Sequence, residues 1–168
     1  SRSFSHFLPV PGAPALDEAA ITRSMAAFPL VGLLLGVLGD AAGWLASFLW
    51  GFPLHAIVVV VCWAVLTARL HLDGVADSCD GLFSWRSRQR QLEIMKDSRI
   101  GTMGALGLIV VLLLKIGALL SLGEAWWLGA VLAPVWGRWA DIYGIFWFPV
   151  ASADGLARTF RQQVRRSD

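Results

Sequence analysis

Three aspartates, Asp73, Asp77 and Asp80, lie close together in a short polar segment between two long apolar stretches. If this segment is helical, a rotation of about 100° per residue leaves Asp77 and Asp80 within about 40° of Asp73. Arg69 falls on the same face. Like charges at this spacing destabilise a helix unless something compensates, and carboxylate oxygens are the ligands that Mg²⁺ prefers. The pattern therefore predicts a Mg²⁺ site held by the three aspartates, with a solvated acidic face as the alternative.

Two residues near these acids are excluded from the predicted site. His71 lies about 160° away from Asp73 on the same helical projection. Cys79 also points away from the acidic face, which argues against a zinc site. Cys62, the second cysteine, lies in an apolar run and is interpreted as a small buried hydrophobe.

A second polar segment, RSRQRQLEIMKDSRIGTMG, begins at Arg86. Its spacing predicts an amphipathic helix lying at a membrane interface. The favoured role for its arginines is anchoring at lipid headgroups; they are Arg86, Arg88 and Arg90.

The end of that segment carries different chemistry. Asp97 is a candidate for completing the metal cluster or for acting as a base. Lys96 and Arg99 flank it and are candidates for binding phosphate. A further cation, Arg138, either pairs with Asp141 or reaches a phosphate in a cavity open to the cytoplasm.

The elements that position these residues are long apolar blocks. The chain is 57% hydrophobic and 15% charged, whereas an average soluble domain is about 25% charged. Blocks of about twenty apolar residues suit membrane-spanning helices. We expect an all-α polytopic membrane bundle in a single domain, 1–168, with four spans over about 26–48, 54–70, 104–122 and 125–148. A glycine stripe in the first span predicts close helix packing; its members are Gly32, Gly36, Gly39 and Gly43.

The placement of Lys and Arg predicts the orientation. The segment 71–103 and both ends carry basic residues, whereas the turns at 50–53 and 123–124 carry none. The positive-inside rule then places segment 71–103 and both ends in the cytoplasm. Asp40 and Lys115, inside the predicted spans, receive no assigned role.

Clustered aspartates beside basic residues at a membrane surface point to phosphoryl or nucleotidyl transfer. Metal ions would neutralise a pyrophosphate and activate a hydroxyl, and an aspartate would accept its proton. The sequence has no glycine-rich phosphate loop and no serine–histidine triad pattern.

The stretch LHLDGVADSCDGLFSWRSRQRQLEIMKDSRIGTMG, with FPLVGLLLG before it and APVWGRWA after it, resembles the cobalamin synthase family, the adenosylcobinamide-GDP ribazoletransferases. The resemblance covers about residues 28–161. It implies a Mg²⁺-dependent enzyme that joins α-ribazole, or its 5′-phosphate, to adenosylcobinamide-GDP and releases GMP.

The resemblance also assigns roles to matching positions. It implies metal ligands at Asp73, Asp77 and Asp80, and catalytic acids at Asp80 and Asp97. It also implies that Lys96, Arg99 and Arg138 face phosphate. Arg69, which shares the face of the aspartates on the helical projection, is a further expected substrate-binding residue. The expected setting is a multi-pass protein of the bacterial cytoplasmic (inner) membrane whose active site faces the cytoplasm. We expect no nucleic-acid partner, and a homo-oligomer is left open.

Two alternatives and one departure remain. The Asp73-Gly74…Asp77…Asp80 pattern is similar to that of the CDP-alcohol phosphotransferases, but Ala76-Asp77 stands where their Ala-Arg pair would fall. A divalent-cation carrier is a further alternative, although the acids lie at a span end rather than at the midplane. Members of the cobalamin synthase family continue past the basic tail, so we expect further C-terminal spans beyond Asp168.

Overall fold

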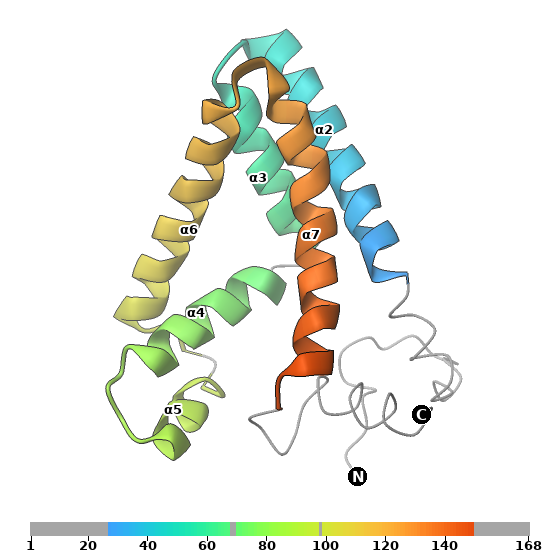
Figure 1. Ribbon diagram of the computed structural model, residues 1–168. Helices are drawn as coiled ribbons and strands as arrows, with labels where there is room; N and C mark the ends of the chain where they lie inside the picture. Colours follow the sequence, from blue (N-terminus) through green and yellow to red (C-terminus); the bar gives the residue numbers. More distant parts are fainter. Residues whose placement is uncertain (1–26, 68–69, 98, 150–168) are drawn as a thin grey trace, which may run out of the picture. The chain divides into compact units, whose positions relative to one another are not determined.

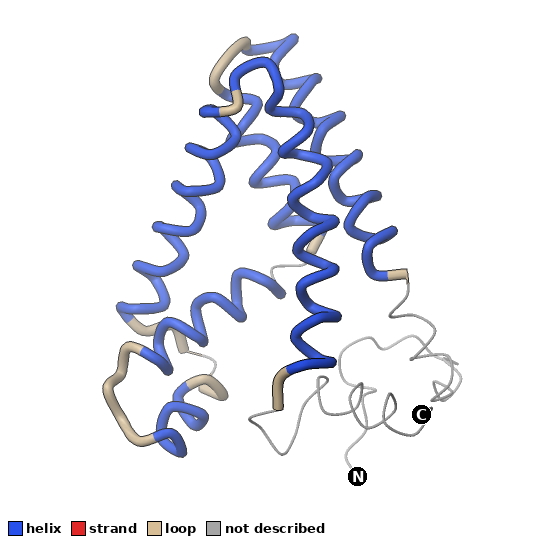
Figure 2. The backbone as a smooth tube through the Cα atoms, viewed as in Figure 1, coloured by secondary structure: helices blue, strands red, loops and turns tan. Residues whose placement is uncertain are grey.

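The computed structural model describes residues 27–67, 70–97 and 99–149, and these residues form helices joined by short connections (Figures 1 and 2). No strand occurs among them. The helices are α2 (Phe28–Trp50), α3 (Leu54–Leu66), α4 (Leu70–Leu82), α5 (Arg88–Ile94), α6 (Thr102–Ser121), the 3₁₀ turn η2 (Gly123–Ala125) and α7 (Trp126–Trp147). The all-α prediction is thereby confirmed.

The chain divides into two compact units, which are described separately. The larger unit is Phe28–Asp141 and contains every residue discussed below. The other consists of Ser1–Ala27 and Ile142–Asp168, of which the described part is Ala27, the last turns of α7 and the two residues after them.

The glycine stripe of α2 packs as the sequence predicts, and it serves two neighbouring helices. Gly32, Gly36, Gly39 and Gly43 are all buried. A Cβ added at Gly36 would lie 2.5 Å from the carbonyl oxygen of Val131 in α7. A Cβ added at Gly39 would lie 2.5 Å from Nε1 of Trp63 in α3. Only glycine permits these approaches, so the stripe fixes α2 against both α3 and α7.

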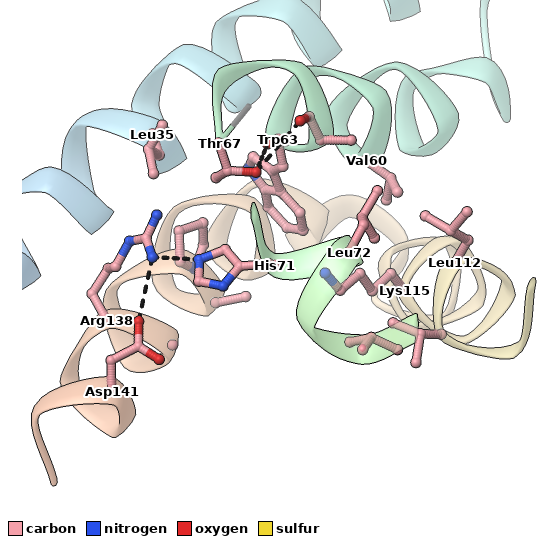
Figure 3. Close-up of a pocket in the computed structure, with 16 residues that line it drawn as sticks. Leu35, Val60, Trp63, Thr67, His71, Leu72, Leu112, Lys115, Arg138 and Asp141 are labelled. Atoms are coloured by element: carbon pink, nitrogen blue, oxygen red, sulfur yellow. Dashed lines mark hydrogen bonds and ion pairs between the residues drawn. The ribbon is translucent and has the colours of Figure 1, made fainter. Parts of the chain in front are cut away.

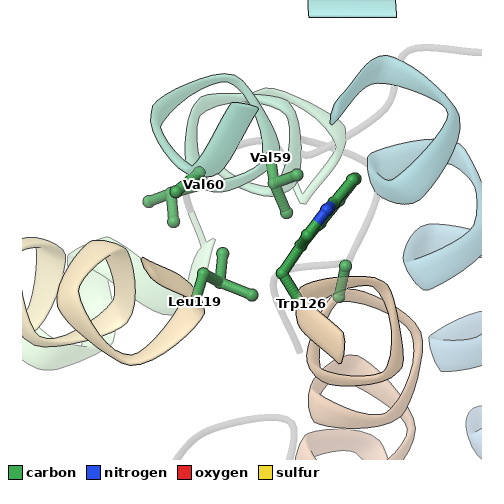
Figure 4. Packing of buried hydrophobic residues seen from close by; sticks show 6 residues of the cluster. Val59, Val60, Leu119 and Trp126 are labelled. Atoms are coloured by element: carbon green, nitrogen blue, oxygen red, sulfur yellow. The ribbon is translucent and has the colours of Figure 1, made fainter. Parts of the chain in front are cut away.

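The apolar core of this unit lies near the two turns. Val59 and Val60 of α3 meet Leu119 of α6 and Trp126 of α7 (Figure 4). Ala56 and Ala130, both 0% exposed, complete the cluster. The α2–α3 turn and the α6–α7 turn therefore lie at the same end of the unit, as the predicted topology requires.

The helix after the first turn differs from its predicted span. A span over 54–70 is expected, but α3 is only 13 residues long and ends at Leu66. Helix α4 then begins at Leu70, with an axis 88° from that of α3. At 1.5 Å per residue α3 extends about 20 Å, less than the roughly 30 Å of a bilayer core.

Within the described residues, two helices are long and apolar enough to cross a membrane, Phe28–Trp50 and Thr102–Ser121. The count rises to three if the bent pair of α3 and α4 forms one span. Many large apolar side chains stay exposed, such as Leu113 and Leu114 of α6 at 63% and 67%. A helix bundle with such outward faces suits lipid. The four-span count stays a prediction.

Candidate active site

The acidic stripe lies on one helix, as predicted. Asp73, Asp77 and Asp80 all belong to α4, so the helical projection that places them on one face holds. Asp73 is exposed and Asp77 is half-buried. Burial raises the pKa of the Asp77 carboxyl, and the charges of Asp73 and Asp80 raise it further. The stripe therefore concentrates negative charge at a helix face that gains from a bound cation.

Asp80 differs from the other two acids because it is bound to another helix. Its Oδ2 accepts a hydrogen bond of 2.7 Å from the amide of Gly101, and its Oδ1 accepts one of 2.7 Å from the amide of Gly104. Gly101 is the N-cap of α6 and supplies no capping side chain. Asp80 thus caps α6 from a distance, since the first amides of a helix otherwise have no partner.

Three glycines at the start of α6 lie against the side of α4 that faces α6. A Cβ added at Gly101 or Gly104 would collide with the Asp80 carboxylate. A Cβ added at Gly107 would collide with Sγ of Cys79. Cys79 therefore packs against the same helix that Asp80 caps, although the two residues lie about 100° apart on the helical projection. α4 therefore lies closely along the first half of α6, in a register fixed by three glycines.

The second polar segment is only partly helical. A helix from Arg86 is expected, but α5 covers Arg88–Ile94, so Arg86 and Asp97 lie outside it. Gly81 of α4 contacts Met95, just after α5: a Cβ added at Gly81 would lie 2.5 Å from Cγ of Met95. This contact packs the end of the second polar segment against the C-terminal end of α4.

Asp97 and Arg99 are paired with each other. Nη2 of Arg99 lies 2.8 Å from Oδ2 of Asp97, and Nε also donates to this carboxylate. The hydrogen bonds from Arg99 lower the pKa of Asp97. Both residues and Lys96 are exposed. The pair keeps Asp97 ionised, and it leaves Lys96 with no ion pair among the described residues.

The predicted acids are not all gathered into one ready-made metal site. In the part of the chain that the structure describes, no three His, Cys, Asp or Glu side chains form a group that could hold a metal ion. Both oxygens of Asp80 face the amides of α6. Mg²⁺ is often bound by only one or two carboxylates together with substrate phosphates. The carboxylates of Asp73 and Asp77, which α6 does not engage, fit that mode of binding. The magnesium site is therefore retained as a prediction.

Arg138 lies in a cavity of about 400 Å³ between the helices (Figure 3). Its Nη1 lies 3.3 Å from Oδ2 of Asp141, so the two residues pair as expected. The same Nη1 contacts Nε2 of His71 in α4. Arginine can only donate, so Nε2 of His71 accepts and the ring is neutral with its proton on Nδ1. Lys115 of α6 also lines this cavity.

The cavity faces the opposite side of α4 from the free acids. His71, Leu72 and Val75 line it, and on the helical projection His71 and Val75 lie about 160° and 200° from Asp73. The structure thus separates Arg138 from the acidic stripe, rather than adding it to the same face. Arg69, also predicted to bind substrate, lies outside the described residues.

Sequence reasoning missed three polar residues in this part of the molecule. It assigned no role to His71 or Lys115, which the cavity brings together with Arg138. The available signal was a pair of cations, Lys115 and Arg138, inside predicted spans, because charges within a span mark functional sites. Asp40 of α2 was also left open, and its Oδ1 is buried without a hydrogen-bond partner among the described residues.

The fold and the site together define a class: a helical membrane protein with an aspartate-bearing helix packed beside its spans. The chain matches the CobS family, described as cobalamin-5-phosphate synthase, over residues 2–168. It is 55% identical over 165 residues to the adenosylcobinamide-GDP ribazoletransferase of Herpetosiphon aurantiacus and 54% identical to that of Roseiflexus sp.. The chain belongs to the cobalamin-5-phosphate synthase family.

The two alignments cover 98% of this chain, but only 66% and 62% of the two relatives. A ribazoletransferase of Klebsiella pneumoniae is 49% identical over 124 residues, which are 73% of this chain and 49% of that relative. The chain thus spans slightly less than two thirds of the length of the Herpetosiphon and Roseiflexus relatives. No solved structure matches it.

Proposed function

We propose that the protein joins α-ribazole, or its 5′-phosphate, to adenosylcobinamide-GDP and releases GMP, in a Mg²⁺-dependent reaction on the cytoplasmic side of a bacterial inner membrane. The observation that carries this proposal is the long match to proteins named adenosylcobinamide-GDP ribazoletransferase, which includes the whole aspartate-bearing segment. Family membership favours this activity over a CDP-alcohol phosphotransferase or a cation carrier.

The name of the reaction determines which bonds change. A hydroxyl oxygen of α-ribazole attacks the phosphorus that stays with cobinamide, and a new P–O bond forms. The bond from that phosphorus to the oxygen bridging to GMP breaks, and GMP leaves with the bonding electrons. The hydroxyl proton passes to a base. The carboxylates of the aspartate-bearing segment are the candidates for that base.

Asp73 and Asp77 are the residues that we propose for holding the ion, because their carboxylates are not engaged by α6. Bound Mg²⁺ would supply charge neutralisation for the pyrophosphate. The raised pKa of Asp77 supports this assignment, since the crowding of like charges that causes it is what a cation relieves.

The two proposed catalytic acids are placed differently. Asp97 is exposed and ionised, so it is able to accept a proton, although pairing with Arg99 weakens it as a base. Asp80 contributes mainly by holding α4 against α6 through its two amide bonds. Lys96 and the free part of the Arg99 guanidinium are available for the phosphates of the substrate.

The test is GMP release by the purified full-length protein in lipid. With adenosylcobinamide-GDP, α-ribazole and Mg²⁺, GMP should form in proportion to the new corrinoid product, and chelation of Mg²⁺ should stop it. No GMP under these conditions contradicts the proposal. CMP release from a CDP-alcohol, or ion flux into liposomes without turnover, would support one of the two alternatives instead.

A further inference from the structure

The cavity that contains Arg138 is a second polar site, separate from the acidic stripe. Its walls come from α2, α3, α4, α6 and α7, all within the unit Phe28–Asp141. Most of the lining is apolar, including Trp63, Leu72, Leu112 and Pro134. Figure 3 shows Arg138, His71 and Asp141 joined by contacts, with the Lys115 ammonium directed into the cavity.

The charges of this cavity do not cancel. Lys115 and Arg138 each carry one positive charge, Asp141 carries one negative charge, and His71 is neutral, which leaves a net charge of +1. Within the described residues Lys115 has no hydrogen bond or ion pair. Arg138 uses only Nη1 for Asp141 and His71, so Nε and Nη2 remain available. An unpaired cation among apolar helices, such as Lys115, is costly, and a bound anion would balance the excess charge.

The depth of the cavity argues against a lipid headgroup as that anion. Lys115 follows Thr102, the first residue of α6, by about 20 Å at 1.5 Å per residue. The hydrocarbon core of a bilayer is about 30 Å thick, with lipid phosphates outside it. The Lys115 ammonium therefore lies beyond the usual depth of a lipid phosphate in the leaflet on the α4 side, and about 9 Å from the other end of α6 at Ser121.

The size of the cavity selects between the two substrates. Pockets for ligands of drug size range over about 300–1,000 Å³, and this one holds about 400 Å³. That volume suits a single nucleoside with its phosphate, and it is too small for a corrinoid ring with an attached nucleotide. Of the two substrates, only α-ribazole 5′-phosphate combines this size with an apolar base and one anionic group.

We infer that this cavity binds the phosphorylated acceptor nucleoside, with its phosphate at Lys115 and Arg138 and its apolar base against the surrounding walls. This inference rests on the proposed function and adds the position of one substrate. Because the cavity lies on the far side of α4 from Asp73 and Asp77, the bound phosphate is not the one that reacts. It is a handle whose binding energy holds the acceptor in place.

The experiment compares two acceptors, α-ribazole 5′-phosphate and α-ribazole, with the full-length protein in lipid nanodiscs at saturating adenosylcobinamide-GDP and Mg²⁺. Lys115→Met removes an unpaired charge from a span, so it should not hinder folding. We expect its KM for the phosphorylated acceptor to rise about tenfold or more, as for a lost charge-assisted hydrogen bond. Its KM for α-ribazole and both kcat values should stay within about twofold. Arg138→Lys, which keeps the charge, should show a smaller change of the same kind.

The matched control is Arg88→Gln, which removes one exposed positive charge outside the cavity and should leave both KM values unchanged. Equal KM increases for the two acceptors in Lys115→Met, or no increase for either, overturn the inference while GMP release by the wild type preserves the proposed function. Absence of GMP from the wild type with both acceptors defeats the proposed function itself.

A binding measurement provides a second readout without turnover. α-Ribazole 5′-phosphate alone should raise the unfolding temperature of the wild type, α-ribazole should raise it less, and Lys115→Met should remove the difference. Stabilisation of the wild type by anionic phospholipid that Lys115→Met abolishes, with no such difference between the acceptors, would assign the cavity to lipid and contradict the inference.

Discussion

The two ends of α6 are held to their neighbours by different forces. At its C-terminal end Leu119 belongs to an apolar cluster with Val59 and Trp126, and the ring of buried His55 packs on Trp126 beside it. At its N-terminal end the helix is held by a carboxylate, Asp80, on the amides of Gly101 and Gly104. The first end needs only shape and packing. The second end keeps acids that packing alone would disfavour: Asp80 stabilises the start of α6 as a cap, whereas, among the described residues, Asp73 and Asp77 make no hydrogen bond with the amides of α6 and are the acids whose presence chemistry explains.

The largest effect should come from removing an acid at the polar end. Asp77→Asn keeps the size of the side chain but removes its charge, so GMP release should fall by about 1,000-fold or more if Asp77 holds the metal. The unfolding temperature should stay the same or rise, because a repulsive charge is lost. Turnover and stability are measured on the same preparation.

Glu93→Gln is the matched control for that substitution. It makes the same chemical change at an exposed acid of α5 and should leave turnover within about twofold. Normal turnover of Asp77→Asn would contradict the metal site and support the alternative, in which the stripe is a solvated acidic face.

The next effect concerns packing between the spans. Gly36→Ala places a Cβ against the carbonyl oxygen of Val131, and backbone on both sides must move. We expect a loss of about 1–3 kcal/mol in unfolding free energy, typical of overpacking. Thermal unfolding in detergent measures it. Gly117→Ala in α6, where a Cβ would meet nothing within 4 Å, is the control and should not destabilise. Equal stability of the two variants would contradict the close α2–α7 contact.

A smaller stability effect separates the two roles of Asp80. Asp80→Ala removes the cap of α6 and should cost about 0.5–2 kcal/mol. Asp80→Asn retains one acceptor oxygen and should lose less stability. If Asp80 acts as a cap, the Mg²⁺ concentration for half-maximal turnover should be similar in Asp80→Asn and wild type. A large increase in that concentration without loss of stability would show that Asp80 is a metal ligand.

The smallest effect is expected at an exposed ion pair. Arg90 and Glu93 of α5 lie 2.7 Å apart, with side chains 64% and 50% exposed. Such i,i+3 pairs contribute at most about 0.5 kcal/mol. Arg90→Gln should therefore leave the unfolding temperature nearly unchanged at high salt, and a marked loss would mean that α5 carries more of the stability than its exposure indicates.

The helical fold and the glycine stripe could be predicted from the sequence, because long apolar blocks and spacings of three and four are local patterns. The break between α3 and α4 could not, since Leu66 to Leu72 contains neither Pro nor Gly. Thr67 gives a physical reason for it: its hydroxyl donates to the carbonyl oxygen of Trp63 at 2.8 Å, and such bonds bend helices.

The acidic face of α4 could also be predicted, because it depends on one helix alone. The roles of the other side chains depend on neighbours that a single helix does not reveal. The cap made by Asp80 requires the start of α6 to lie beside α4, and the contact of His71 with Arg138 joins residues that are far apart in the sequence. Helical angles show which residues share a face, but they do not show what each face meets.

The α2 glycines contact two different helices, and this has a consequence for the order in which the helices pack during synthesis. Gly39 meets Trp63 of α3, which follows directly, and Gly43 meets Val59 of α3 as well as Trp126 of α7. Gly32 and Gly36 meet α7, which leaves the ribosome much later. During synthesis Gly32 and Gly36 therefore face lipid or other chains while the helices between α2 and α7 are inserted. Completion of this groove is a late event in biogenesis, and a chain interrupted before α7 would present an open glycine surface to any helix nearby.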